Sequence, residues 1–322
     1  MTDLVAPEQL EQYNAASRSC GHAQLGRRTQ LQLSGADRAT FLHAFCTADI
    51  TSLASGQGCE AFITSVQGKT LGLVHVFCHQ ETLVLDTVAE QATALRTHLD
   101  RYVIREDVVF TDLSETLESL FVTGPRSGET IASLLPSPLP AEPLNHVDQL
   151  FEESTLSVRR CQSSLDGFWI SGPEVAIHGL AGEFTRTGCQ EIDNVVVEML
   201  RIEAGLPLYG VDLDERNLPQ EVNRDAEAIS FTKGCYLGQE TVARIDALGH
   251  VNWLLTGLLL PAGTLPAAGT IFQQDGSDVA RITSSSYSPR LKKPLALAHV
   301  RQHSSNPGTI LPGAEVIRLP LT

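Results

Sequence analysis

The stretch RIEAGLPLYG, residues 201–210, decides the organisation of the chain because it marks where a helix must end. Residues 194–204 place apolar side chains at helical spacing, so one stripe of that helix faces a core. Gly205 and the proline two positions later cannot continue the helix and predict a turn. The segment therefore leaves one carboxylate, that of Glu203, at the junction of a helix and a turn.

Glu203 has two contrasting interpretations. In the simpler one its carboxylate forms an ion pair with Arg201 or Arg224, as carboxylates near arginines usually do. In the other it accepts two parallel N–H bonds from a flat ring such as pterin or guanine, which presents a pair of donors much as a guanidinium does. Spacing alone favours the ion pair.

A second segment, KGCYLGQE at residues 233–240, carries a candidate nucleophile. Cys235 lies two residues from Lys233, whose positive charge would lower the thiol pKa below its reference of about 8.5. Gly234 and Gly238 lack a Cβ and would let a ligand approach the loop closely. A single cysteine is more often a buried, inert side chain, which is the competing interpretation. The sequence thus offers Cys235 and Lys233 as candidate catalytic residues.

Other chemistry has weaker support. The seven cysteines show no C-x-x-C spacing, so no metal site is predicted. Their odd number, in a chain with no export signal, predicts no disulfide framework. Residues 285–288 lack the G-x-S-x-G elbow of a serine hydrolase, and His75 and His79 are interpreted as half-buried histidines on a strand.

The first half of the chain predicts a small α+β layer. A strand at residues 29–33 leads into a helix that ends near Ile50, and further elements follow in an order that does not repeat βαβ. They are strands on both sides of the turn Gln67-Gly68-Lys69, a strand at 83–88, a helix at 89–103, a strand at 107–110 and strands within 167–178.

The sequence pattern changes in the second half of the chain. Four prolines within residues 136–145 predict a surface connection, because proline removes backbone donors and fixes φ. After residue 249, short apolar runs are punctuated by proline and glycine, as in a small all-β sandwich or barrel. A domain boundary is therefore expected near residue 245.

Composition limits the partners of the protein. The sum of 23 Lys and Arg against 38 Asp and Glu gives a net charge of -15, which disfavours broad DNA binding. No window reaches the roughly twenty uninterrupted apolar residues that span a bilayer. The first thirteen residues carry no Lys or Arg, unlike a secretory or transit peptide. We therefore expect a soluble, cytoplasmic protein of two or three folded units.

Taken together, the two segments support a resemblance. RIEAGLPLYGVDLDERNLPQE, residues 201–221, followed by KGCYLGQETVAR, residues 233–244, resembles the YgfZ family of tetrahydrofolate-binding proteins, relatives of the glycine cleavage T-protein (aminomethyltransferase). The second motif is the more discriminating, because K-G-C-Y-x-G-Q-E marks YgfZ-type proteins and their mitochondrial iron–sulfur assembly counterparts. Weaker similarity runs from about residue 28 to 318, about nine-tenths of the chain.

The resemblance implies an α+β fold of three domains in a cloverleaf around a central channel, of the aminomethyltransferase type. Two domains would be ferredoxin-like α+β units, and the third a C-terminal all-β barrel. Domain 1 would comprise residues 1–50 and 116–244 and bind folate, domain 2 residues 51–115, and domain 3 residues 245–322.

The resemblance also implies a ligand and partners. Tetrahydrofolate or a one-carbon derivative would be the cofactor, with its pterin held by Glu203. The other implied cofactor-binding residues flank Glu203 or Cys235; they are Arg201, Tyr209, Gly234, Gly238 and Gln239. The partners would be iron–sulfur client proteins, with no DNA and no membrane.

One departure bears on activity. The aminomethyltransferase branch carries an aspartate after a glycine pair, whereas the corresponding residues 68–74, GKTLGLV, hold no carboxylate. Aminomethyl transfer would lose its acid or base there, a contribution of roughly 10² to 10⁴-fold. We therefore favour a YgfZ-like folate-binding protein that supports assembly or repair of iron–sulfur enzymes through Cys235. The alternatives are a folate-dependent aminomethyltransferase in which another group replaces the aspartate, and a non-catalytic scaffold with a vestigial channel.

Overall fold

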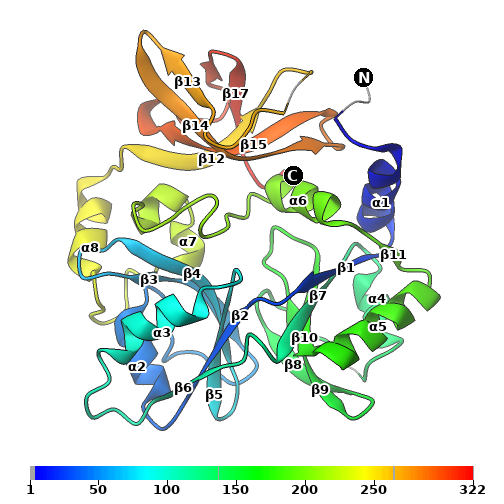
Figure 1. Ribbon diagram of the computed structural model, residues 1–322. Helices are drawn as coiled ribbons and strands as arrows, with labels where there is room; N and C mark the ends of the chain where they lie inside the picture. Colours follow the sequence, from blue (N-terminus) through cyan, green and yellow to red (C-terminus); the bar gives the residue numbers. More distant parts are fainter. Residues whose placement is uncertain (1–3, 137, 264, 322) are drawn as a thin grey trace.

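The structure is a computed structural model that describes residues 4–136, 138–263 and 265–321. Two α+β lobes lie side by side and a β-barrel lies above them, as Figure 1 shows. Residues 1–3 of the N-terminal segment and Ser137 of the proline-rich connection lie outside the described residues. The rest of that connection, residues 136 and 138–145, forms neither helix nor strand. None of the described helices combines the length and apolar character needed to cross a lipid bilayer.

The first lobe is built on a six-stranded sheet in the order β11-β1-β7-β10-β9-β8. Its pairings are antiparallel except for β1 with β11, and inward-facing side chains such as Leu120 and Ile170 pack against α5. The strands are β1 (Gly21–Gly26), β7 (Leu117–Thr123), β8 (His146–Phe151), β9 (Ser154–Arg160), β10 (Gly167–Pro173) and β11 (Gln190–Glu191). The helices are α1 (Pro7–Arg18), α4 (Ser127–Ala132), α5 (Glu174–Arg186) and α6 (Asn194–Glu203).

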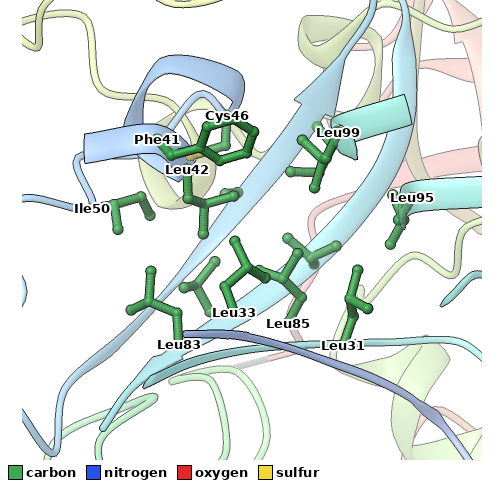
Figure 2. Close-up of a cluster of buried hydrophobic side chains, with 14 of the residues drawn as sticks. Leu31, Leu33, Phe41, Leu42, Cys46, Ile50, Leu83, Leu85, Leu95 and Leu99 are labelled. Atoms are coloured by element: carbon green, nitrogen blue, oxygen red, sulfur yellow. The ribbon is translucent and has the colours of Figure 1, made fainter. Parts of the chain in front are cut away.

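The second lobe is a five-stranded antiparallel sheet in the order β3-β4-β5-β2-β6, covered by two helices. Alternate residues of its strands, such as Leu31, Leu33 and Leu85, form a core with Leu42 and Leu99 from the helices (Figure 2). The elements are β2 (Thr29–Ser34), α2 (Arg38–Phe45), β3 (Gly58–Thr64), β4 (Thr70–Cys78), β5 (Thr82–Thr87), α3 (Ala92–Asp100) and β6 (Val109–Asp112).

The barrel is a nearly closed antiparallel sheet in the order β13-β14-β15-β12-β17-β16. Ala280, Ala298 and Val300 fill its interior, so the residues that alternate with them face outward. The elements are β12 (Trp253–Leu259), β13 (Ile271–Gln274), β14 (Ser277–Ser288), β15 (Lys293–Arg301), the 3₁₀ turn η2 (Gln302–Ser304), β16 (Ile310–Leu311) and β17 (Ala314–Ile317). The α+β class with a C-terminal barrel is confirmed.

The segment between α6 and the barrel runs across the second lobe and holds η1 (Pro219–Val222), α7 (Asp225–Ala228) and α8 (Gln239–Leu248). Figure 1 shows α6 beneath the barrel, and α8 at the outer side of the second lobe. The first of the two segments that carry the resemblance therefore begins beneath the barrel, whereas the second ends in α8 at the outer side of the second lobe.

Three local predictions are wrong. The helix expected to end near Ile50 ends at Phe45, because Cys46 and Thr47 pair with β3. Residues 174–178, expected as strand, begin α5, whose buried side chains follow a period of 3.6 rather than 2. Gln239 and Glu240, interpreted as the end of the loop that carries Cys235, instead begin α8.

Two longer-range expectations also differ from the structure. Cys20 and Cys189 form a disulfide, because the parallel pairing of β1 with β11 brings them together from 169 residues apart. Spacing in the sequence could not reveal that pair. Residues 29–50, expected in domain 1, contribute β2 and α2 to the sheet and core of the second lobe.

Candidate functional site

A cavity of about 240 Å³ lies where the two α+β lobes meet the segment after α6, and we call it the central cavity. β3, β4 and β5 of the second lobe supply one wall, and β7, β10 and the loop before β10 supply another. Its polar and aromatic lining comprises Arg28, Glu60, His75, Asp86, Thr87, Phe121, Gln162, Trp169, Glu198, Arg201 and Tyr209. The cavity therefore lies between the domains, where the resemblance implies a central channel.

Aromatic side chains from several elements line the central cavity. Trp169 lies 5.0 Å from His75 between ring centroids, and the Arg28 guanidinium lies 5.7 Å from the Trp169 ring. Tyr209 lines the cavity as well, and burial raises its pKa to about 12, so its hydroxyl stays protonated. These flat side chains favour a planar ligand.

The carboxylates of the cavity are neutralised by arginines. Asp86 accepts hydrogen bonds from Arg28 and from the buried Arg159, both at 2.7 Å. Burial alone would raise the pKa of Glu60, but a hydrogen bond with His75 and the charge of Arg224 lower it to about 2. Such carboxylates remain ionised at neutral pH and are weak bases.

Gln162 separates the central cavity from a second cavity of about 390 Å³ on the barrel side, and its side chain lines both. The Gln162 amide lies 2.5 Å from His75 Nε2, while its other polar atom is buried without a partner in the part of the chain that the structure describes. Whichever way the amide is turned, one of its two polar atoms remains free. A buried unpaired polar atom costs about 1–3 kcal/mol unless a ligand or water meets it.

The structure places the predicted site residues in separate parts of the molecule. Arg201 and Tyr209 line the central cavity, where Arg201 pairs with Glu198 and, at 2.7 Å, with the buried Asp212. Glu203 borders a different hollow: its carboxylate accepts hydrogen bonds from the hydroxyls of Tyr13 and Ser288.

The expected ion pair of Glu203 with Arg201 or Arg224 is therefore wrong. Residues two apart on a helix point to different faces, so Arg201 cannot reach Glu203. Arg224 is committed to Glu60.

The Cys235 segment lies apart from the cavity. Lys233 donates three hydrogen bonds to the backbone carbonyls of His43, Cys46 and Ala48 at the end of α2, and burial lowers its pKa. Its ammonium thus binds backbone carbonyls at the end of α2. The spacing had predicted instead that it lowers the pKa of the Cys235 thiol. Cys235 is exposed, and none of residues 233–240, all of them described, lines the central cavity.

The glycines of this segment also have a different use from the predicted one. A Cβ on Gly238 would lie 2.5 Å from the carbonyl oxygen of Ser65. The absence of a Cβ therefore lets the β3–β4 turn pack closely against this loop, rather than letting a ligand approach it. A Cβ on Gly234 would make only an ordinary contact with His43 Nε2 at 3.9 Å, and Gln239 begins α8. The segment is anchored on the second lobe and presents its thiol outward.

Spacing does not reveal the residues that shape the cavity. Arg28, Asp86, Gln162 and Trp169 come from four separate elements or loops, and no local pattern marks any of them. The sequence predicts His75 only as a half-buried histidine. Trp169 offers one signal, because the chain has only two tryptophans.

Family comparisons assign nearly the whole chain. Residues 5–227 match the model described as the GCVT N-terminal domain, and residues 255–312 match the glycine cleavage T-protein C-terminal barrel domain. The gap between them contains the Cys235 segment.

Individual proteins agree with these matches. A chloroplastic protein of Arabidopsis thaliana, named as a putative transferase, is 27% identical over 296 residues, 89% of this chain and 67% of the relative. The mitochondrial aminomethyltransferase of Homo sapiens is 26% identical over 322 residues, 91% of this chain and 75% of the relative. The crystal structure of the glycine cleavage system aminomethyltransferase T from Bartonella henselae superposes with a TM-score of 0.87 at 18% identity, covering 98% of this chain and 90% of that one. This last likeness shows the fold.

Proposed function

The chain belongs to the GCVT N-terminal domain family and carries the glycine cleavage T-protein C-terminal barrel domain, and we propose that it binds a tetrahydrofolate in its central cavity. The observation that carries the proposal is the buried amide of Gln162, which has one polar atom free between two cavities. A ligand with both donors and acceptors along one edge would satisfy that atom. A pterin ring has such an edge.

The dimensions of the cavity fit the head of a folate. A volume of about 240 Å³ is below the roughly 300–1,000 Å³ usual for a whole drug-sized ligand. The bicyclic ring would therefore lie inside, and the p-aminobenzoyl-glutamate tail would extend outward. Trp169 and Tyr209 would contact the ring faces. Tetrahydrofolate, when bound, supplies the nitrogen atoms that carry a one-carbon unit.

Gln162 replaces Glu203 as the proposed pterin contact. Both oxygens of Glu203 already accept hydrogen bonds, and they link α1 to the barrel through Tyr13 and Ser288. We assign Glu203 a structural role at that junction.

The two tryptophans allow a direct test, because Trp169 lines the central cavity and Trp253 does not. In a Trp253→Phe variant, 5-formyltetrahydrofolate is expected to quench the remaining Trp169 fluorescence in a saturable way. Adding Gln162→Leu should weaken binding roughly five- to tenfold, because one buried hydrogen bond is lost at similar volume. Glu203→Gln should leave the dissociation constant unchanged.

Two outcomes would contradict this assignment. Binding that Glu203→Gln weakens while Gln162→Leu does not would return the pterin to Glu203. Protection of Cys235 from iodoacetamide by the folate would place the thiol at the ligand rather than on a separate surface.

For Cys235 we propose a role toward a partner protein. Among the seven cysteines, all of them described, only Cys235 is exposed, and it lies outside the central cavity. An accessible thiol on an anchored loop fits contact with an iron–sulfur client protein better than chemistry on an enclosed folate. This arrangement and the KGCYLGQE motif support the YgfZ-like role in assembly or repair of iron–sulfur enzymes.

Aminomethyl transfer remains the alternative, because carboxylates do face the central cavity. Leu73 lines the cavity within the segment that lacks an aspartate, and Glu60 and Asp86 are carboxylates that line the same cavity and are the candidates to replace it. His75 and Arg224 lower the pKa of Glu60, however, and Arg28 and Arg159 lower that of Asp86, which makes both carboxylates poor proton acceptors. The geometry therefore favours a folate-binding protein over a T-protein enzyme.

A further inference from the structure

A third hollow, of about 390 Å³, lies on the outside of the barrel beneath the loop of residues 211–217, and we call it the barrel-side hollow. It shares no lining residue with the central cavity. Asp212 lines the hollow and pairs with Arg201, which lines the central cavity. One oxygen of this buried carboxylate accepts hydrogen bonds from Arg201 and the Leu208 amide, and the other accepts from Thr283 and Ser284 of β14.

Strand register places four large side chains on the face of the barrel beneath this loop. In the antiparallel ladder Arg281 lies opposite His299, and Trp253 lies opposite Arg301. The residues that alternate with them on β14 and β15 are buried in the barrel interior, so these four side chains face outward together. The Arg301 guanidinium covers the Trp253 ring at 4.1 Å.

His299, one of the residues that line the hollow, has an unpaired acceptor. Its Nε2 lies 2.8 Å from the backbone carbonyl oxygen of Asp212, which can only accept, so Nε2 carries the hydrogen. Nδ1 of the neutral ring is then an acceptor, and it is buried without a partner among the described residues. A ligand that presents an N–H group would satisfy it.

Arg281 supplies a cation that the protein itself does not use. Its side chain is exposed and has no ion pair or hydrogen bond in the described ranges, although the chain as a whole carries a charge of -15. The other arginine of the hollow, Arg216, pairs with Asp214. An anionic ligand group would therefore find Arg281 available in the same hollow as the Trp253 ring.

We propose that the barrel-side hollow binds a small anion that carries a planar, aminated ring, the chemistry of a nucleoside monophosphate. The ring lies against Trp253, an amino group donates to His299 Nδ1, and the phosphate pairs with Arg281. This site is independent of the proposed folate in the central cavity.

The test uses AMP as the probe and calorimetry to measure binding. AMP is expected to bind with a dissociation constant near or below about 1 mM. Arg281→Gln should weaken binding at least about tenfold, as loss of a charge-assisted pair does. Arg281 is exposed and unpaired among the described residues, so this variant should fold. Arg96→Gln, an exposed arginine on α3 in the second lobe, is the matched control and should change nothing.

Fluorescence locates the ligand. In a Trp169→Phe variant only Trp253 remains, and AMP is expected to change its emission. Adenosine lacks the phosphate, and inorganic phosphate lacks the ring. Each should therefore bind at least about tenfold more weakly than AMP. 5-Formyltetrahydrofolate should leave the Trp253 signal unchanged.

Three results would overturn the proposal. The first is absence of both heat and fluorescence change up to about 10 mM AMP. The second is AMP binding that Arg281→Gln leaves intact. The third is a Trp253 response to the folate but not to AMP, which would assign the hollow to the folate instead.

Discussion

Replacement of Asp86 by alanine is expected to lower the free energy of unfolding by about 3–5 kcal/mol, as loss of one partner from a buried ion pair does. Asp86 is 3% exposed and joins two arginines, of which Arg159 is 2% exposed. Without the carboxylate, the Arg159 guanidinium would remain buried beside Arg28 and would lose its ion-pair partner. Urea denaturation of the purified variant measures the change.

Two control variants separate this cause from general damage. Asp100→Ala removes an exposed carboxylate at the end of α3 and should change stability by no more than about 0.5 kcal/mol. The double variant Asp86→Leu with Arg159→Met should recover much of the loss, because it removes the unpaired charge as well as its partner. If the double variant is no more stable than Asp86→Ala, the ion pair is not the cause.

The same substitution has a defined pH dependence. Burial opposes ionisation of Asp86, but Arg28 and Arg159 more than offset it and lower its pKa. A group with a lowered folded-state pKa stabilises the fold above its unfolded pKa, about 3.9 for Asp, and loses that contribution as the pH falls. The difference in the free energy of unfolding between wild type and Asp86→Ala should therefore be largest at pH 7 and become smaller below about pH 4.

Gly238→Ala should destabilise the protein by roughly 3 kcal/mol or more. Gly238 has φ +84°, a left-handed conformation that alanine adopts only with strain. A Cβ there would also lie 2.5 Å from the Ser65 carbonyl oxygen and 2.9 Å from the Gly68 Cα, which are backbone atoms that cannot move aside. The thermal midpoint and denaturant midpoint should both fall.

Gly234→Ala is the matched control within the same loop. The nearest atom to its added Cβ would be His43 Nε2 at 3.9 Å, an ordinary contact, and its φ is not positive. We expect a change of no more than about 1 kcal/mol. Equal losses in the two variants would mean that the loop tolerates neither substitution, and that close packing against the β3–β4 turn is not the reason.

Local patterns predicted much of the fold. The turn at Gln67-Gly68-Lys69 joins β3 and β4, and the alternation in residues 29–33 forms β2. Helix α6 ends one residue before its predicted end, close to Gly205. These predictions succeeded because glycine, proline and apolar periodicity act within a few residues of where they occur.

The candidate site was harder to predict because its geometry is set by distant segments. Lys233 lies two residues from Cys235 in sequence, yet its ammonium contacts carbonyls near residue 46. Glu203 found hydroxyl partners from α1 and from β14, 190 and 85 residues away. Gln162 and Trp169 acquire their significance only when the two lobes meet. Spacing carries no information about such contacts.

The position of Lys233 has a consequence for the neighbouring cysteine. The last carbonyls of a helix usually take their donors from water or from the residues that follow directly. At the end of α2, a single ammonium from 187 residues further along fills that role for Cys46 and its neighbours. Because Lys233 holds the loop in place, the neighbouring Cys235 sulfur is exposed and also fixed in position. A partner protein would meet this thiol in one defined place rather than on a mobile loop.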